Sequence, residues 1–226
     1  LRVATAFDTG NKVEQALEKD FPAAKFSRIA LDKVGPTVGQ EIQTSAVYAI
    51  LLALFGILIY VAFRYEFSFA VGAVVAIIHD VLMTLGWFFL TGRELNAPMV
   101  AAVLTIIGFS INDTVVIFDR IREDLKLGMR GTLREVINKA LNQTLSRTLI
   151  TSGTVFLATL SLYIFGGRVI NDFAFTFLVG IITGTYSSIY IASTIVLWWH
   201  KGERPDLGSK VMVENTVSAR PQPLRP

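Results

Sequence analysis

Five long apolar segments constrain this chain more than any other feature of its sequence. They run over about residues 46–63, 67–91, 97–118, 145–165 and 173–199. Each is close to the roughly 20 helical residues that cross the ~30 Å hydrocarbon core of a bilayer. They lack the polar alternation of a barrel strand that lines a lumen, so we predict helices. The chain is therefore predicted to be an all-α membrane protein with a five-helix transmembrane bundle.

The distribution of Lys and Arg predicts how this bundle is oriented. The segment at 119–147 carries seven of them and the tail at 200–226 carries five, whereas the turns on the opposite side carry only Arg93 and Arg168. The positive-inside rule then places residues 119–147 and the tail in the cytoplasm and residues 1–45 outside. The end of the tail is expected to be disordered. We interpret the pI of about 9.2 as a sign of this topology and of contact with anionic lipids of the bilayer. Nothing in the sequence points to nucleic acid.

Residues 1–45 are predicted to be the C-terminal part of an extracytoplasmic α+β domain and its linker. The sequence at 11–21 opens with an Asn cap, has a helical apolar face and stops at Pro22, and an alternating pattern at about 25–34 predicts a strand. One helix and one or two strands bury too little apolar surface to fold alone. The first residue is also Leu rather than Met, so we expect a fragment or processed product with something missing upstream.

A further helix is predicted at 132–144, between the third and fourth spans. Thr132 and Glu135 have the spacing of a capping box. Apolar residues at helical spacing follow on one face: Leu133, Val136, Ile137, Ala140 and Leu141. An amphipathic helix of this kind is expected to lie along the inner leaflet. The alternative is a solvated connector that packs on neighbouring loops.

Polar residues inside the spans carry the candidate chemistry. Asp113 lies six residues before the charged boundary at Asp119, which corresponds to a depth of roughly 9 Å along a helix. A carboxylate there costs on the order of 3 kcal/mol and loses hydration, which favours its protonated form, so Asp113 is a candidate proton carrier. The alternative is a shallow Asp that hydrates from the cytoplasmic end and only hydrogen-bonds a neighbouring helix. The adjacent Asn112 is assigned to the same proton pathway, although an Asn at such a position more often forms an interhelical hydrogen bond.

Arg147, near the start of the fourth span, is the natural counter-charge for Asp113. Its side chain can turn inward toward the carboxylate or extend to the inner headgroups, and the sequence leaves both arrangements open. If the two residues pair, protonation of Asp113 would weaken the attraction between them. Such a pair would have the two states that a proton relay requires.

His79 and Asp80 form a second polar site near the middle of the second span. Titratable groups at that depth are expected to face a cavity or the bundle interior. Neighbouring residues on a helix point about 100° apart, so we do not expect these two to pair with each other. They can serve a proton path, or Asp80 can be held by a Ser or Thr hydroxyl group.

Motifs for other chemistry are missing from the sequence. The second histidine, His200, is at the far end of the chain and offers no metal-ligand spacing with His79, and cysteine is absent. The sequence contains no phosphate-binding loop, nucleophile elbow or zinc-protease motif. We therefore predict no enzyme activity, no cofactor and no metal ion.

Four motifs together resemble the SecF family of protein-export membrane proteins. They are "VGPTVGQE" at 34–41, "HD" in the second span, "GFSINDTVVIFDRIRE" at 108–123 and "NQTLSRTLITS" at 142–152. The similarity runs over about residues 30–200. It implies a fold with six spans and a periplasmic domain between the first two. The five spans here would then be the second to sixth, and the chain could be the SecF end of a fused SecDF protein.

The resemblance also implies a function. It suggests one half of an RND-like transporter in the bacterial cytoplasmic membrane, which works with SecD and uses the proton-motive force to move preproteins through the SecYEG channel. In the family, the carboxylate of the "ND" pair and the arginine before "TLIT" belong to the proton path, which here are Asp113 and Arg147. Another essential carboxylate lies on SecD. Two alternatives remain: a scaffold of the translocon that conducts no protons, and half of an RND-type small-molecule exporter.

Overall fold

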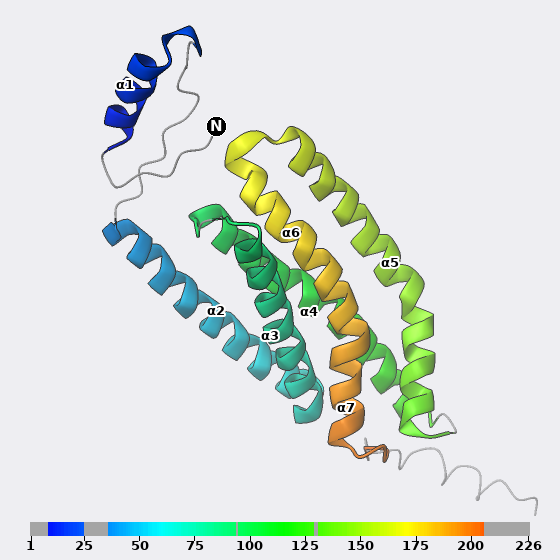
Figure 1. Ribbon diagram of the computed structural model, residues 1–226. Helices are drawn as coiled ribbons and strands as arrows, with labels where there is room; N and C mark the ends of the chain where they lie inside the picture. Colours follow the sequence, from blue (N-terminus) through cyan, green and yellow to red (C-terminus); the bar gives the residue numbers. More distant parts are fainter. Residues whose placement is uncertain (1–8, 25–35, 94, 129–130, 206–226) are drawn as a thin grey trace, which may run out of the picture. The chain divides into compact units, whose positions relative to one another are not determined.

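The computed structural model describes residues 9–24, 36–93, 95–128 and 131–205. Every regular element in these ranges is helical (Figure 1). They are α1 (Gly10–Asp20), a 3₁₀ turn (Pro22–Ala24), α2 (Pro36–Arg64), α3 (Phe67–Leu90), α4 (Ala97–Lys126), α5 (Leu133–Phe165), α6 (Gly167–Ser187), a π-helix (Ser188–Ala192) and α7 (Ser193–Trp199). The chain divides into two compact units, residues 1–48 and 49–226.

The predicted membrane bundle is confirmed. Within the described residues, five helical stretches are long and apolar enough to cross a bilayer, and they cover residues 39–64, 67–90, 97–126, 133–165 and 170–199. The last stretch consists of α6, the π-helix and α7 in one continuous run. The protein is therefore a multi-pass membrane protein.

The first unit contains α1, which confirms the helix predicted at 11–21. The helix begins at Gly10, so Asn11 lies inside its first turn and is not the cap residue that the sequence suggested. None of the residues of α1 is buried, as expected for an element that needs further structure to cover its apolar face. The strand predicted at about 25–34 lies outside the described residues, so the α+β domain stays a prediction.

The third span is longer than predicted. We expected it to end near Phe118, but α4 continues to Lys126. Arg120 forms ion pairs with Glu123 (2.7 Å) and Asp124 (3.3 Å) in this extension, and pairs at this spacing stabilise a helix. The expected charged loop is reduced to the few residues between α4 and α5, where Gly128 and Gly131 have positive φ angles.

The fourth span corrects the prediction of a separate amphipathic helix at 132–144. These residues are the beginning of α5, which runs unbroken from Leu133 to Phe165 because no Gly or Pro interrupts its first half. The predicted capping box is present, with Glu135 N bonded to Thr132 Oγ1 and Thr132 N bonded to the Glu135 carboxylate. The apolar stripe does not lie on the inner leaflet, because most of it is buried in the protein core.

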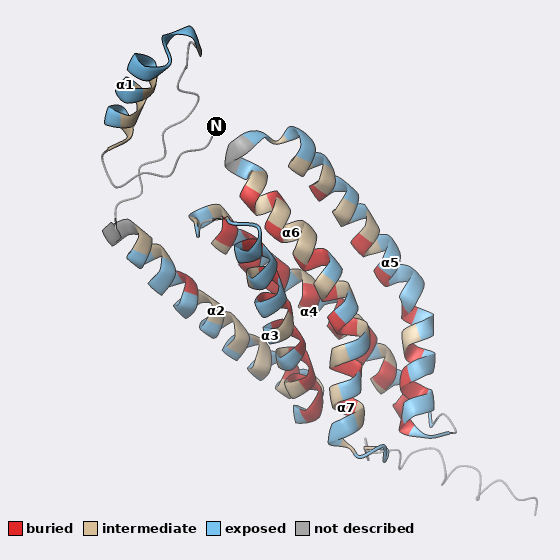
Figure 2. Ribbon diagram, viewed as in Figure 1, coloured by how far each residue is buried: buried red, intermediate tan, exposed pale blue. Residues whose placement is uncertain are grey.

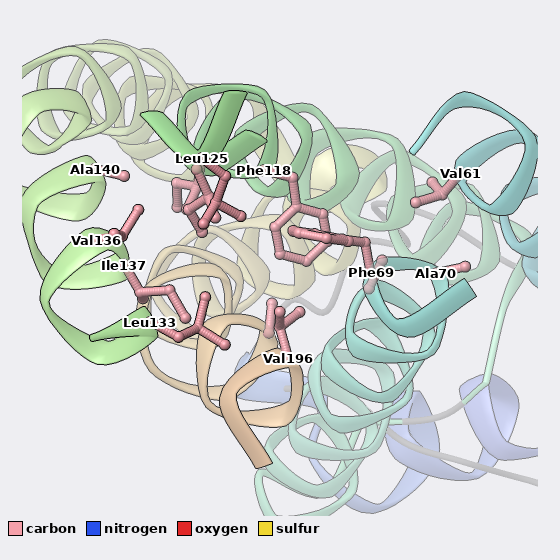
Figure 3. Close-up of a cluster of buried hydrophobic side chains, with 14 of the residues drawn as sticks. Val61, Phe69, Ala70, Phe118, Leu125, Leu133, Val136, Ile137, Ala140 and Val196 are labelled. Atoms are coloured by element: carbon pink, nitrogen blue, oxygen red, sulfur yellow. The ribbon is translucent and has the colours of Figure 1, made fainter. Parts of the chain in front are cut away.

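That core lies at the end of the bundle where α4 and α5 are joined. Phe69 of α3 and Phe118 of α4 meet edge to face, with ring centroids 4.9 Å apart, a favoured geometry for aromatic pairs. Figure 3 shows Val61 on one side of these rings and the start of α5 on the other. The residues that α5 buries here are Leu133, Val136, Ile137 and Ala140. The stripe therefore packs α5 against the core at α4 and α7.

α6 is central in the bundle and packs against α3, α4 and α5. Small residues allow this close approach, because a methyl group placed on Gly180 would lie 2.2 Å from the Ile106 side chain of α4. A methyl group placed on Gly184, one turn further along, would lie at ordinary contact distances from Ser110 and Asp80. Buried residues therefore follow the faces that α3, α4 and α6 turn toward one another (Figure 2).

Candidate functional site: a polar network inside the bundle

Asp113 lies on the inner face of α4, and its residue surface is only 3% exposed. Ser152 of α5 donates a hydrogen bond to Asp113 Oδ2 over 3.2 Å. The Ser152 hydroxyl is in turn 2.9 Å from Thr185 Oγ1 on α6. A chain of two hydroxyl groups therefore connects the carboxylate of Asp113 to two neighbouring helices.

Arg147 does not contact Asp113. Its side chain is exposed, and the ion pairs within 4.0 Å in the described ranges do not include this one. Any attraction between the guanidinium and the Asp113 carboxylate therefore acts over more than the 4.0 Å of an ion pair. The hydrogen-bond partner of Asp113 is thus a neutral hydroxyl group rather than a cation.

Asp80, on α3, is completely buried. Its Oδ2 atom accepts hydrogen bonds from Ser110 of α4 and Ser187 of α6, both at 2.7 Å. Its Oδ1 atom lies 3.1 Å from His79 Nδ1, so the prediction that His79 and Asp80 do not pair was wrong. Their Cβ atoms diverge around the helix, but the partly exposed imidazole bends back toward the carboxylate, which has a fixed position between two serines.

Asn112 faces away from this network and is exposed. It lies in a groove of about 400 Å³ between α2 and α4. The other lining residues are Gly56, Ile57, Tyr60, Gly108, Ile111 and Val115. Across the parts of the chain that the structure describes, Asn112 makes none of the hydrogen bonds between helices, so the predicted interhelical bond is not formed within this bundle.

A third contact joins α4 to the π-helix. Thr114 Oγ1 lies 2.9 Å from Ser188 Oγ, and Ser188 also donates to the Ser110 carbonyl oxygen over 3.3 Å. These hydroxyl residues were not predicted from the sequence. A signal was available, because Ser110 and Thr114 are four residues apart on the same α4 face and flank Asp113.

A charged clamp joins the α3–α4 connection to α6. Arg93 pairs with the Asp172 carboxylate and donates to Asn171 Oδ1 (2.9 Å), and its guanidinium lies 4.3 Å from the centre of the Phe175 ring. Asn96 donates to the other oxygen of Asp172 over 2.6 Å. From the sequence, Arg93 was identified only as a charge in a turn, because its partner is distant along the chain. Within the described ranges, no three His, Cys, Asp or Glu side chains are grouped to hold a metal ion.

Residues 12–202 match the family model described as "Protein export membrane protein SecD/SecF, C-terminal". The chain belongs to this SecD/SecF family. It is 53% identical over 177 residues to a protein translocase subunit SecF from Calditerrivibrio nitroreducens, an alignment that covers 77% of the chain and 58% of that relative. It is 45% identical over 186 residues to a SecDF from Thermus thermophilus, covering 82% of the chain and 25% of that protein.

Crystal structures of SecDF have the same helical bundle. The superposition on SecDF from Thermus thermophilus has a TM-score of 0.76 at 42% identity and covers 88% of this chain and 28% of that one. For SecDF in a super-membrane-facing form, the TM-score is 0.73 at 39% identity, with 88% and 27% covered. The chain spans a little over half of the SecF relative from Calditerrivibrio nitroreducens and about a quarter of SecDF.

Proposed function

We propose that this bundle is part of a Sec translocase subunit that works with SecD and uses the proton-motive force to promote preprotein translocation through SecYEG. The names of its relatives, protein translocase subunits SecF and SecDF, support a role in protein translocation. In this proposal the protein acts in a bacterial cytoplasmic membrane, with its N-terminal region outside and its C-terminus in the cytoplasm. It is a transport protein rather than an enzyme, and protons are the small species that it handles.

The observation that carries the proposal is the position of Asp113. This carboxyl group is buried in the bundle and is bonded to the neutral hydroxyl of Ser152. A carboxyl group with such a partner can gain or lose a proton without breaking an ion pair, and either change alters the hydrogen bonding between α4 and α5. Burial of a carboxylate inside a membrane costs free energy, and a neutral polar side chain could join two helices at a lower cost.

Arg147 has an electrostatic role in this scheme. In this proposal its positive charge, on the same helix as Ser152, attracts the Asp113 carboxyl group when that group is ionised and not when it is protonated. Because the side chain is exposed, it can move toward or away from Asp113 during a cycle.

We assign the groove between α2 and α4 to contact with SecD. Asn112 presents an amide in an otherwise apolar, membrane-embedded groove, and a polar group there is stabilised by a hydrogen bond from another transmembrane helix. A methyl group placed on Gly56 or Gly108 would have no atom of another helix within 4 Å, so both positions leave room for such a helix. If the purified chain kept this groove closed without SecD, this part of the proposal would be wrong.

The decisive experiment replaces Asp113 by Asn in the full-length protein. This substitution keeps the shape of the side chain and removes its ability to gain and lose a proton. We expect Asp113→Asn and Arg147→Ala to abolish the component of preprotein export in cells that an uncoupler removes from the wild type. The matched control is Asp119→Asn on the exposed part of α4, which should export normally.

The same experiment tests the scaffold alternative. That alternative has its own support, since Asp80 joins α3, α4 and α6 through two serine hydroxyls. Normal export by Asp113→Asn, at wild-type protein level and with SecD bound, would reject the proton role and favour the scaffold. Loss of small-molecule efflux with unchanged preprotein export would favour the exporter.

A further inference from the structure

A short stretch at the end of α6 and the start of the π-helix makes three contacts around Asp80 and Asp113. Thr185 reaches Asp113 through Ser152. Two residues later, Ser187 bonds directly to Asp80. Ser188 then bonds to Thr114, the neighbour of Asp113 on α4. Asp80 and Asp113 lie on different helices. Their hydrogen-bond networks meet on residues 185–188, and Ser110 of α4 adds a bond to Asp80 from the helix that carries Asp113.

The helix changes its form at the end of this stretch. Ser188–Ala192 is a π-helix between two α-helical segments. Ser187 and Ser188 are adjacent and both completely buried, although neighbours in an α-helix point about 100° apart. Ser187 bonds to α3 and Ser188 bonds to α4, because both of these helices pack against α6 and the π-helix. π-helical turns are rare in proteins, and those that occur often lie at functional sites.

α3 also contacts the far end of the π-helix. A methyl group placed on Gly72 would lie 2.9 Å from the Ala192 carbonyl oxygen, so the two backbones are in close contact there. At the start of the π-helix, Ser187 and Ser188 bond to Asp80 and Thr114. At its end, Ala192 packs on the backbone of α3. A displacement of α3 against α4 would act on both of its ends.

We propose that residues 185–192 form a hinge that couples Asp80 to Asp113. Asp80 is a positioning residue in this assignment: it holds Ser187 while a change in the Asp113 hydrogen bond is transmitted through Ser152 to Thr185. The π-helix then absorbs the change, and α7 moves relative to α5. This inference rests on the proposed proton role of Asp113 and adds the element that converts it into motion.

Distance measurements between spin labels test the hinge directly. Residues 1–226 contain no cysteine. With any cysteine outside them replaced by serine, labels can be placed by Leu157→Cys on α5 and Trp198→Cys on α7, both on exposed side chains. The full-length protein, in lipid with its SecD partner, is compared with Asp113→Asn, Asp80→Asn and Ser187→Ala versions. We expect each of the three to change the distance distribution by on the order of 2 Å, the usual scale of helix shifts.

The matched control is Thr105→Ala on α4, whose exposed hydroxyl bonds only to the carbonyl of its own helix in the described contacts. It should leave the distribution unchanged. Export assays of the same variants give a second readout. Ser187→Ala and Asp80→Asn should each lower gradient-dependent export at least about fivefold, the lower end of typical coupling between sites. The double variant should be no worse than either single variant, since both interrupt one link.

The outcomes separate this inference from the proposed function. If Asp113→Asn abolishes export but leaves the label distances unchanged, the hinge is wrong and the proton role stands. Additive losses in the Ser187 and Asp80 double variant would also overturn the hinge. If Asp113→Asn exports normally while the distances change, the mechanical link stands and the proton role fails. Should Ser187→Ala fold poorly, the comparison of wild type with Asp113→Asn still decides the matter.

Discussion

Ser152 of α5 donates a hydrogen bond to Asp113 of α4 across 3.2 Å inside the membrane bundle. The carboxylate is therefore bound to a neutral neighbour, while the cation that the sequence offered, Arg147, stays exposed. This relationship decides how the two helices can respond to a proton. Protonation changes a single bond between α4 and α5 rather than releasing a locked ion pair.

Removal of the Ser152 hydroxyl should impair proton-dependent work. Hydrogen bonds to charged groups contribute roughly 1.5–3 kcal/mol, so Ser152→Ala should reduce gradient-dependent export on the order of tenfold. Ser152→Thr keeps a hydroxyl and should restore much of the activity. Thr151→Ala removes an exposed hydroxyl that bonds to the Arg147 carbonyl of the same helix. If that control variant lost as much export as Ser152→Ala, the effect would belong to α5 as a whole.

Close packing of α4 on α6 should not tolerate a larger residue at Gly180. A methyl group there would overlap Ile106, and overpacking of a core typically costs about 1–3 kcal/mol. Gly180→Ala should therefore lower the midpoint of thermal unfolding of the purified protein. Adding Ile106→Ala should make the double variant less unstable than the sum of the two single variants. Gly153→Ala, where nothing lies within 4 Å, should be neutral or stabilising.

The charged clamp should stabilise the connection between α3 and α4. The side chains of Arg93 and Asp172 are only 17% and 12% exposed, and removal of one partner from a buried pair costs about 3–5 kcal/mol. Asp172→Ala and Arg93→Ala should each destabilise the protein strongly in thermal unfolding. Their combination should be clearly less than additive. Glu123→Ala breaks the more exposed pair with Arg120 and should change stability by less than about 1 kcal/mol.

The capping box at the start of α5 should have a local effect. Thr132→Ala removes the bond to Glu135 N, and loss of such a cap costs typically ~1 kcal/mol. Hydrogen exchange should accelerate over residues 133–140, where α5 joins the core, while α6 keeps its protection. Equal acceleration along the whole of α5 would show that the first turns do not unfold separately.

The membrane-spanning elements could be predicted because they depend on local properties of the chain. Apolar length identifies a span whatever its neighbours are, since each helix satisfies its own backbone hydrogen bonds in lipid. The same argument singled out Asp113 and Asp80, because a carboxylate inside an apolar run is costly wherever the run packs. The predicted ends were less accurate. α4 continues beyond its apolar run through a segment that contains Arg, Glu and Lys, which are good helix formers, and α5 includes the amphipathic segment that precedes its apolar run.

The sequence by itself determined the five spans, their helical character and the buried carboxylates. Only the tertiary structure decided which groups those carboxylates meet. Asp80 lies between Ser110 and Ser187, which are 77 residues apart, and the partner of Asp172 is Arg93, 79 residues away. The choice between Arg147 and Ser152 as the neighbour of Asp113 depends on the rotation of α5 about its axis. That rotation is set by packing of α5 on α4 and α6, and packing between helices is a property of several distant segments at once.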